Sequence, residues 1–258
     1  MPNPSLIPKV GAADEPAREA ACVLRTEALS KTYGGAPALD GLDMRVPRGS
    51  IYGFVGRNGA GKTTLIRLIC GLHAPTSGRF SLFGARGDGA GIAEARRRMG
   101  AVVESPAIYM DMTAQENLEQ QYRVLGLTDF DTIPGLLRRV GLEHTGKKKA
   151  RRFSLGMKQR LGLAVALAGD PDFLVLDEPL NGLDPQGIAA LRALLLELNR
   201  ARGATILISS HNLHELSRLA THYGIIENGR MLREFRADEV SGDLEAYYLS
   251  LVGGDAHA

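Results

Sequence analysis

Short apolar runs along the chain alternate with segments whose apolar residues recur at helical spacing. Residues 51–56 form a continuous apolar run, which predicts a central strand buried on both faces. In residues 62–70 the apolar positions fall at helical spacing, and Gly71 marks the end of the predicted helix. Residues 173–179 and 204–211 repeat the buried-strand pattern. This alternation predicts an α/β fold with a mostly parallel sheet covered by helices.

The remaining segments of the α/β pattern include one long helix and several shorter strands. The helix is predicted to open at Asp184 and Pro185, to carry leucines along one face, and to end at Gly203. Residues 223–235 predict a hairpin with Asn-Gly at its turn. Further strands are expected at residues 42–46, 79–83 and 99–104.

The middle of the chain has a wholly helical pattern. Thr113 and Glu116 form a capping box that opens a first predicted helix. A second helix is expected at residues 133–142, and a third follows with Ser154 as its cap. The segment of about residues 105–168 therefore predicts an all-helical subdomain inserted between two halves of an α/β core.

Length and composition agree with one large domain or a core with an inserted subdomain. The chain has 258 residues, of which 44% are hydrophobic and 23% charged, as in ordinary soluble globular proteins. A net charge of +2 gives no global attraction to nucleic acid or anionic lipid. No stretch approaches the roughly 20 apolar residues that cross a bilayer.

The N-terminus and the cysteines point to a chain that stays in a reducing compartment. Residues 1–21 are rich in Pro and Ala and lack the basic start and apolar core of a secretion signal, so we expect a flexible extension. The only cysteines, Cys22 and Cys70, show no metal-ligand spacing. We expect both to be small buried groups in a reducing cytoplasm.

A glycine-rich sequence, GRNGAGKTT, lies between a predicted strand and a predicted helix. Its glycines let successive backbone N–H groups point inward and cradle phosphates, and the new helix adds its positive end. Lys62 is expected to reach the β- and γ-phosphates, and the Thr63 hydroxyl to ligate Mg²⁺. The predicted nucleotide-binding residues are Gly56, Arg57, Asn58, Gly59, Ala60, Gly61, Lys62, Thr63 and Thr64.

Two acids end the predicted strand in residues 173–179. Asp177 is expected to orient Mg²⁺, and Glu178 to act as the general base for attack of water on the γ-phosphate. A solvated pair of acids at a strand end is the alternative, and the presence of the phosphate loop weighs against it. His211 ends the next predicted strand, at the edge where ligands gather in open α/β sheets, and is expected to hydrogen-bond the γ-phosphate. The expected catalytic residues are thus Lys62, Glu178 and His211.

With these segments in place, the chain resembles the nucleotide-binding subunit of ATP-binding-cassette transporters. The resemblance covers about residues 23–235 and rests on an ordered set of sequences: GRNGAGKTT, AVVESP, FSLGMKQR, FLVLDEP with NGLD, and SSH. It implies a P-loop NTPase core over residues 22–235, with a small N-terminal antiparallel β part and the inserted helical subdomain. Residues 236–258 are then expected to be a C-terminal helix or tail. ATP and Mg²⁺ are the implied cofactors.

The resemblance also implies a second cassette as a partner, because in that family two cassettes face each other head to tail. The family's Leu-Ser-Gly-Gly-Gln signature corresponds to residues 153–157, in which Ser154 and Gly156 are retained. Leu155 and Met157 depart from it. The retained hydroxyl and N–H groups are expected to close over the γ-phosphate of the ATP bound to the other cassette.

Two further residues take roles from the resemblance. Tyr33 matches the aromatic residue that stacks on adenine in the family, and a tyrosine packed on the domain surface is the alternative. Asp184 matches the acid that crosses the dimer interface. It also suits the cap of the long helix, and both roles can hold together.

Glu104, in AVVESP, stands where most transporters of the family carry Gln. This substitution and the sequences around it resemble the subgroup of bacitracin-resistance and lantibiotic-immunity exporters. In the family, this loop touches Mg²⁺ and the attacking water and leans against the transmembrane partner. We therefore hypothesise that Glu104 ligates Mg²⁺ or its water and couples the nucleotide state to the membrane partner. A surface acid at a strand end is the alternative.

The resemblance implies an ATP-hydrolysing subunit that powers a membrane exporter, with a peptide antibiotic or other drug as cargo. An integral membrane permease is then the expected partner, and the chain is expected in the cytoplasm, on the inner face of the cell membrane. The basic runs at residues 96–98 and 147–152 suit a solvated face or a contact with lipid headgroups or the permease. Because no aromatic residues are interleaved with them, nucleic acid is not an expected partner.

Two alternatives to a transporter subunit come from other classes of ATP-dependent protein. A soluble mechanical ATPase that acts on DNA would carry a long coiled coil, for which the segment between Lys62 and Ser154 is too short. One that acts on ribosomes would have two cassettes in one chain. A small-molecule kinase would need a pocket for the phosphate acceptor and would not need FSLGMKQR or His211.

Overall fold

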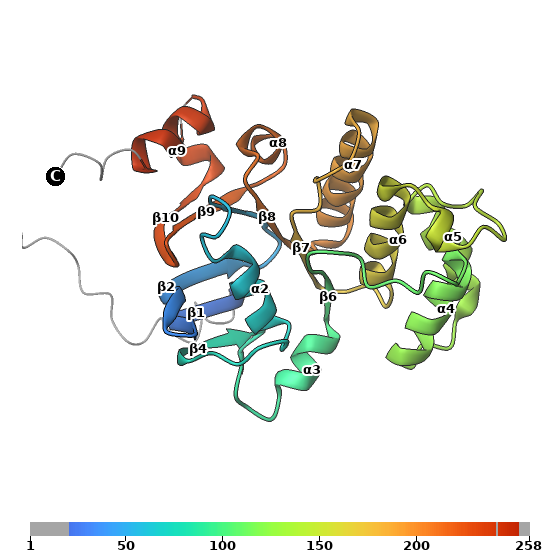
Figure 1. Cartoon of the computed structure of the whole chain (residues 1–258), viewed down its shortest axis with the longest axis horizontal. Coiled ribbons are helices and arrows are strands. Elements are labelled where there is room, and N and C mark those ends of the chain that lie inside the picture. The colour runs from blue at the N-terminus through green and yellow to red at the C-terminus, as the bar shows by residue number, and fades with distance from the viewer. Residues whose placement is uncertain (1–20, 241, 253–258) are drawn as a thin grey trace, which may run out of the picture.

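The computed structural model describes residues 21–240 and 242–252, which form two sheets surrounded by helices (Figure 1). The expected N-terminal extension lies outside the described residues except for residue 21, as does the end of the chain from residue 253. The larger sheet has six strands and the smaller has four.

The six-stranded sheet forms the centre of the molecule. Its strands are β3 (Ile51–Val55), β6 (Met99–Val102), β7 (Phe173–Asp177), β8 (Thr205–Ser210), β9 (His222–Glu227) and β10 (Arg230–Arg236). They lie in the order β10-β9-β3-β8-β7-β6, and every pair is parallel except β9 with β10. Strands β3, β7 and β8 are buried along their whole length, which agrees with their continuous apolar runs. The predicted hairpin is present, with Asn228 and Gly229 at positive φ in its turn.

The four-stranded sheet is antiparallel and comes mainly from the N-terminal part of the described chain. It consists of β1 (Cys22–Tyr33), β2 (Ala36–Pro47), β4 (Ser77–Leu82) and β5 (Ala85–Arg86), in the order β2-β1-β4-β5. Helix α2 (Lys62–Ile69) packs between the two sheets through its buried residues Leu65, Ile66, Leu68 and Ile69. The apolar stripe predicted from residues 62–70 is therefore the part of the core that joins the sheets.

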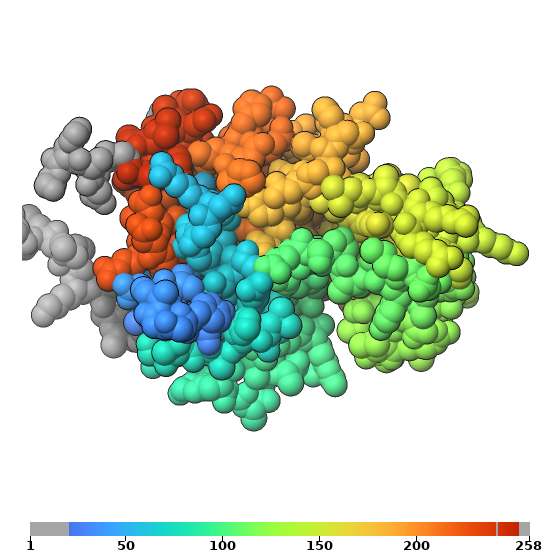
Figure 2. All heavy atoms as spheres, viewed as in Figure 1, coloured from blue at the N-terminus to red at the C-terminus, as the bar shows by residue number. Residues whose placement is uncertain are grey.

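The regular elements between β6 and β7 are all helices, apart from an isolated bridge between Thr113 and Lys149. It contains α4 (Ala114–Leu125), η2 (Phe130–Thr132), α5 (Ile133–Arg139), η3 (Ala150–Arg152) and α6 (Leu155–Leu167). These elements gather at one end of the molecule, away from the four-stranded sheet (Figure 1, and green to yellow in Figure 2). The capping box opens α4 as predicted, because Thr113 and Glu116 exchange side-chain and backbone hydrogen bonds.

The helical end touches the sheet by close backbone contacts that only glycine permits. A Cβ on Gly100 of β6 would lie 1.9 Å from the carbonyl oxygen of Ala166 in α6. A Cβ on Gly162 would lie 2.5 Å from the side chain of Pro106, in the loop after β6. Helix α6 is therefore held directly against β6 and the loop that carries Glu104.

The remaining helices cover the other strands. Helix α7 (Pro185–Arg202) buries the predicted leucine stripe and ends at Gly203, which has a left-handed conformation. The others are α3 (Ile92–Arg97), α8 (Leu213–Ser217), η4 (Ala237–Glu239) and α9 (Leu244–Val252). Among the helices of residues 21–240 and 242–252, none combines the length and apolar character needed to cross a bilayer.

Candidate nucleotide-binding site

The loop between β3 and α2 has a backbone shape that depends on its glycines. Gly59 and Gly61 have φ angles of 83° and 111°, in the left-handed region that disfavours side chains. A Cβ on Gly56 would lie 2.4 Å from the carbonyl oxygen of Ile226, and one on Gly61 would lie 2.6 Å from that of Ala38. The N-cap of α2 is Gly61, and no side chain caps this helix. The first-turn N–H groups of α2 are thus left for an anion.

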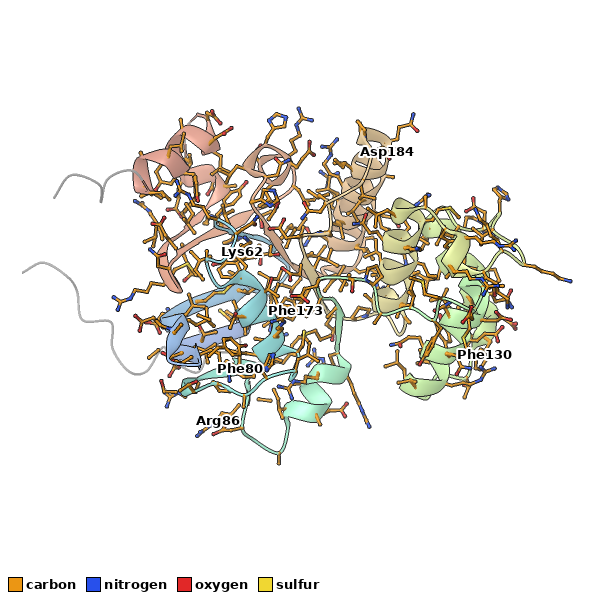
Figure 3. All side chains as sticks on the ribbon, viewed as in Figure 1. Lys62, Phe80, Arg86, Phe130, Phe173 and Asp184 are labelled. Atoms are coloured by element: carbon orange, nitrogen blue, oxygen red, sulfur yellow. The ribbon has the colours of Figure 1, made fainter. Side chains whose placement is uncertain are left out.

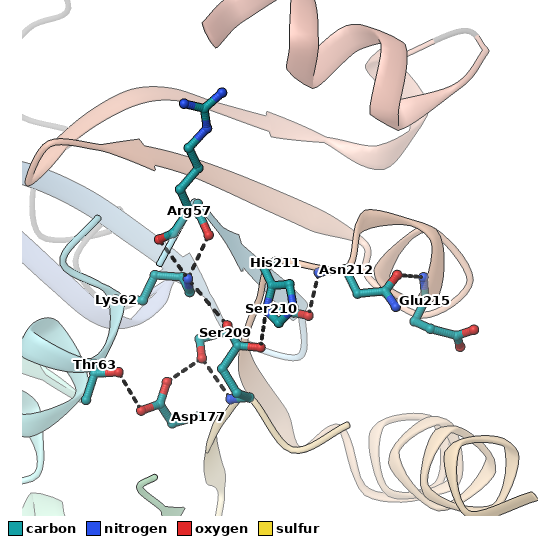
Figure 4. A network of polar contacts seen from close by, with 11 residues as sticks. Arg57, Lys62, Thr63, Asp177, Ser209, Ser210, His211, Asn212 and Glu215 are labelled. Atoms are coloured by element: carbon teal, nitrogen blue, oxygen red, sulfur yellow. Dashed lines mark hydrogen bonds and ion pairs between the residues drawn. The ribbon is translucent and has the colours of Figure 1, made fainter. Parts of the chain in front are cut away.

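Lys62 is buried within this loop (Figure 4). Its Nζ donates hydrogen bonds to the carbonyl oxygens of Gly56 at 2.7 Å and Arg57 at 3.2 Å. The Arg57 side chain points away from the cluster (Figure 4). The Lys62 Nζ also lies 3.4 Å from Glu178 Oε1, a buried oxygen that receives no hydrogen bond from the described residues. A lysine held among carbonyl oxygens and a carboxylate can turn toward phosphate oxygens when these replace its present partners.

Asp177 is buried at the end of β7, and its carboxylate accepts hydrogen bonds from two hydroxyl groups (Figure 4). Thr63 Oγ1 donates to its Oδ2 at 2.8 Å, and Ser209 Oγ donates to its Oδ1 at 2.5 Å. Ser209 also accepts a hydrogen bond from the backbone N–H of Glu178 at 2.9 Å. Thr63 and Asp177 are hard oxygen ligands at one place, as Mg²⁺ prefers. Within the described residues there is no cluster of three or more His, Cys, Asp or Glu suited to a metal, so the other ligands of Mg²⁺ would be phosphate oxygens and water.

Sequence reasoning missed Ser209, although the signal was present. Ser209 belongs to the SSH sequence before His211, and β8 pairs Ser209 with Asp177 in register. Because the partner of a strand residue depends on sheet order, the sequence alone did not indicate which acid this hydroxyl would meet.

Glu178 lies between the phosphate loop and the end of β8. Its Oε2 is 3.0 Å from Nδ1 of His211, while its other oxygen faces Lys62. Its φ angle is 49°, a left-handed conformation that is uncommon for a residue with a side chain and is often found at functional sites. The side chain of Glu178 is only 20% exposed, whereas that of His211 is 49% exposed. The structure therefore brings together the predicted catalytic residues Lys62, Glu178 and His211.

Glu104 follows β6 and has a φ angle of 59°. Its carboxylate forms an ion pair with Arg67 of α2, and 55% of the side chain is exposed. The carboxylate makes no contact with Thr63 in the described structure, but Glu104, Asp177 and Glu178 line the same cavity. Glu104 thus lies near Asp177 and Glu178, while its carboxylate is paired with Arg67.

Tyr33 is the last residue of β1 and is 39% exposed. Its ring meets that of His73 edge to face with centroids 5.6 Å apart, and Lys31 Nζ lies 5.1 Å from its centroid. The ring is therefore held in place but keeps an open surface. His73, to which the sequence assigned no role, orients this ring.

The other predicted nucleotide-binding residues lie at the starts of α6 and α7. Ser154 caps α6 by accepting a hydrogen bond from the N–H of Met157 at 3.3 Å, and Gly156 follows in its first turn. Asp184 caps α7 by accepting from the N–H of Gly187 at 2.8 Å. Lys62 and Asp184 lie well apart in Figure 3. None of the described contacts joins Ser154, Gly156 or Asp184 to the phosphate loop of the same chain.

The cysteines are half-buried, not fully buried as expected. Burial raises the pKa of the Cys70 thiol to about 11, against a smaller opposing effect of Arg96. Burial likewise raises the pKa of Cys22. Both thiols are therefore protonated at neutral pH and are poor metal ligands.

Residues 39–181, which include the phosphate loop, Ser154 and Asp177, match the family model described as ABC transporter. The chain belongs to the ABC transporter family. Like other ABC ATPases it binds ATP and couples its hydrolysis to transport, and this membership confirms the expected family and the P-loop NTPase fold. The alternative of an ATPase not coupled to transport is not favoured.

The most informative relatives of this ABC ATPase are named after peptide antibiotics. The chain is 46% identical to the bacitracin transport ATP-binding protein BcrA of Bacillus licheniformis, over 84% of this chain and 71% of the relative. It is 38% identical to the lantibiotic transport ATP-binding protein SrtF of Streptococcus pyogenes, over 84% and 92%. A solved structure of an ATP-binding subunit of an ABC transporter is 32% identical, with a TM-score of 0.81 over 89% of this chain and 99% of the other.

Proposed function

We propose that this ABC ATPase powers the export of a peptide antibiotic or similar drug through a separate membrane permease. The observation that carries the proposal is the convergence of Lys62, Glu178 and His211 with the Thr63–Asp177 pair at one edge of the sheet. The similarity to ATP-binding proteins of bacitracin and lantibiotic transport supports the class of cargo. The outward direction of transport rests on the resemblance of Glu104 and the residues around it to the exporter subgroup.

In this proposal the phosphates bind the first-turn N–H groups of α2 and the glycine-rich loop. Lys62 leaves the carbonyl oxygens of the loop and binds the β- and γ-phosphate oxygens. The open face of Tyr33 stacks on the adenine ring, which gives about 1–3 kcal/mol without reading the base strictly. Gly56 and the residues up to Thr64 thus act together as the nucleotide-binding segment.

Thr63 and Asp177 are suited to hold Mg²⁺, the first directly and the second through water. When bound, Mg²⁺ neutralises charge on the phosphates during transfer of the phosphoryl group. Ser209 keeps the Asp177 carboxylate oriented by its hydrogen bond. Glu104 joins this site when its carboxylate leaves Arg67.

Glu178 accepts a proton from the water that attacks the γ-phosphate in line with the leaving oxygen. His211 Nδ1 fixes the orientation of the Glu178 carboxylate, and its exposed ring can also contact the γ-phosphate. Once phosphate binding withdraws Lys62 from Glu178 Oε1, that oxygen is free to receive the water proton. Lys62 stabilises the charge that develops on the phosphoryl group.

A second copy of the chain completes the site in this proposal. Ser154 and Gly156 offer a hydroxyl and N–H groups at the exposed start of α6, where an anion is favoured by the helix dipole. Because they have no contact with their own phosphate loop, they serve the ATP of the partner cassette. Asp184, exposed at the start of α7, crosses the same interface.

The proposed membrane partner lies on the side of the loop that carries Glu104. We place the chain at the inner face of the membrane through its permease, with nucleic acid having no part in its action. The basic residues 96–98 and 147–152 suit lipid headgroups or the permease. Glu104 reports the nucleotide state to the permease because it can pair with Arg67 or approach the Mg²⁺ site, but not both.

Phosphate release from Mg·ATP without any phosphate acceptor is the first test of this function. A purified chain should release phosphate, and a Lys62→Ala variant should not, because the triphosphate loses its buried cation. The second part is affinity purification from membranes of the native host, which should recover an integral membrane protein whose loss sensitises cells to a peptide antibiotic. Recovery of ribosomes or nucleic acid in its place would contradict the proposal.

Glu104 has a sharper test of its own. Glu104→Gln should keep part of the ATPase activity, since a neutral oxygen can still ligate Mg²⁺ weakly. Glu104→Ala should raise the Mg²⁺ concentration needed for half-maximal activity and reduce export. Glu94→Ala, which removes an exposed acid of α3, serves as the control. If Glu104→Ala hydrolyses ATP and supports export as well as the parent, Glu104 has no such role.

A further inference from the structure

A cavity of about 240 Å³ lies between α5, α6 and α7, next to the ends of β6 and β7. Buried apolar side chains form its floor, among them Val140, Leu163, Leu176 and Leu191. At about 30 Å³ per water molecule, this volume would hold roughly eight waters, and those on the apolar floor would have few hydrogen-bond partners. A cavity of this kind favours an apolar occupant.

Besides Glu178 Oε1, which faces Lys62, the cavity-lining residues include one other buried polar atom that receives no hydrogen bond from the described residues. The Nε2 of Gln159 donates to the carbonyl oxygen of Asn181, which fixes the direction of the side-chain amide. The Oε1 of Gln159 is buried and receives no hydrogen bond from the described residues. An unsatisfied buried acceptor costs free energy, and a ligand that donates a hydrogen bond to Gln159 would recover it.

The basic residues of the cavity are only weakly engaged. The exposed side chain of Arg138 makes no hydrogen bond or ion pair within residues 21–240 and 242–252. Arg139 reaches only Glu197, at 3.5 Å and near the surface, and Arg160 donates to the carbonyl oxygen of Gly141 at 3.2 Å. A guanidinium without a carboxylate partner is suited to a carboxylate, sulfonate or phosphate group.

The acids on the opposite wall are all engaged. Glu104 pairs with Arg67, and the Glu178 carboxylate lies between Lys62 and His211. An occupant of the cavity therefore meets the unpaired Arg138 guanidinium on one side. On the other side, the Glu104 and Glu178 carboxylates face cations, and the Asp177 carboxylate accepts hydrogen bonds from two hydroxyl groups. This imbalance selects an anionic ligand over a cationic one.

We propose that this cavity binds a small amphipathic anion and that its occupation slows ATP turnover. The apolar body of the ligand lies on the leucine floor, its anionic group binds Arg138, and a donor on the ligand reaches Gln159 Oε1. An occupant packed against Glu178 obstructs the approach of the attacking water to the Glu178 carboxylate. Only this effect on turnover rests on the proposed function, because the binding site does not involve ATP.

The binding test uses 1-anilinonaphthalene-8-sulfonate, which has an apolar ring system, an N–H donor and one sulfonate, and which fluoresces when bound in an apolar site. Ala189 and Ala190 offer a matched pair on α7, since both are exposed and only Ala190 lines the cavity. Wild type should bind the dye saturably in the absence of nucleotide. Ala190→Trp should abolish this binding by filling the cavity, whereas Ala189→Trp should leave it unchanged.

The anion site is tested by a second pair of variants, which also guards against a folding defect in Ala190→Trp. Arg138→Ala should weaken dye binding about tenfold, the usual size of a lost hydrogen bond to a charged group. Arg200→Ala removes an exposed arginine of α7 outside the cavity and should not change the affinity. Equal dye binding by wild type, Ala190→Trp and Arg138→Ala would overturn the site, as would the absence of saturable binding.

The effect on turnover is measured separately. The dye should reduce phosphate release by wild type and by Ala189→Trp, and should not affect Ala190→Trp. Saturable binding with unaltered phosphate release would overturn the regulatory part of the proposal. A chain that bound the dye at this cavity but never hydrolysed ATP would contradict the proposed function and leave the binding site standing.

Discussion

At the carboxyl edge of the six-stranded sheet, each catalytic side chain contacts a residue of another element. In contrast, the polar side chains that cap α6 and α7 form their described hydrogen bonds within the helix that they cap. Asp177 binds hydroxyl groups from α2 and β8, and Glu178 contacts His211. Ser154 and Asp184 each accept one hydrogen bond from the N–H three residues further along. The side-chain contacts at the sheet edge therefore form within one chain, whereas the starts of α6 and α7 have no described contact with that edge.

This difference follows from how the two regions are built. Parallel strands bring residues that are distant in sequence to one edge, where the register sets their contacts. A helix N-terminus is satisfied locally by its cap and exposes the remaining N–H groups. In the function proposed above, one chain prepares the chemistry and a second chain supplies the groups that close over the phosphate.

The largest effect is expected for Glu178, at the carboxyl edge of the six-stranded sheet. Glu178→Gln removes the general base and should lower the rate of phosphate release by about 10²–10⁴-fold. ATP binding should persist, because the glycine-rich loop and Lys62 are unchanged, and the variant should form a dimer in the presence of Mg·ATP. Single-turnover phosphate release and size-exclusion chromatography with and without nucleotide measure these two results.

Glu227 provides the matched control for this variant, since it also ends a strand but lies outside the site. Glu227→Gln should keep both the parent rate and the parent elution profile. Turnover of Glu178→Gln at the parent rate would show that the sheet edge does not carry the chemistry.

A smaller effect is expected at the start of α6. Two variants of Ser154 separate the role of its hydroxyl group as a helix cap from its proposed role in catalysis. Ser154→Ala should lose about 1 kcal/mol of stability with the α6 cap, whereas Ser154→Asn should keep the cap. Both variants should lower the maximal rate of phosphate release by about 10²-fold, because both lose the hydroxyl that stabilises charge on the partner's ATP. Denaturant unfolding and steady-state kinetics provide the two measurements. If Ser154→Asn retains the parent rate, Ser154 serves only as a helix cap.

The smallest effect is expected for the stability contribution of Glu116, in the helical segment between β6 and β7, and it depends on pH. Hydrogen bonds from the Lys149 ammonium and from the N–H of Thr113 lower the pKa of Glu116 from 4.5 to about 2. Since the folded state lowers this pKa, the ionised Glu116 stabilises the fold above the ordinary pKa, and this contribution is lost as the pH falls toward 2.

The difference in the free energy of unfolding between the parent and Glu116→Gln should therefore shrink as the pH falls below about 5. Urea unfolding at a series of pH values gives this difference directly. Gln at this position can still accept the hydrogen bond from Thr113 but cannot pair with Lys149, so Lys149→Met should show the same trend. A difference that stays constant with pH would contradict the assigned pKa.

Much of the fold and of the complete site was predictable, because its signals are local. The apolar runs of β3, β7 and β8, the capping box at Thr113 and Glu116, and the hairpin turn at Asn228 each appear in the structure as expected. The position of Lys62 was also predictable, because the short glycine-rich loop that precedes it determines where it lies. The pairing of Arg67 with Glu104 was not predictable, because it joins two segments through the packing of α2 beside the loop after β6.

What the amino-acid sequence determined by itself is the set of elements and the chemistry at their ends, since periodicity, caps and turns act over a few neighbouring residues. Only the tertiary structure decided which ends meet: Ser209 with Asp177, His73 with Tyr33, and Arg138 beside an apolar cavity. The reason is physical, because strand order and helix packing are settled by the burial of many apolar side chains at once, and no single segment carries that information.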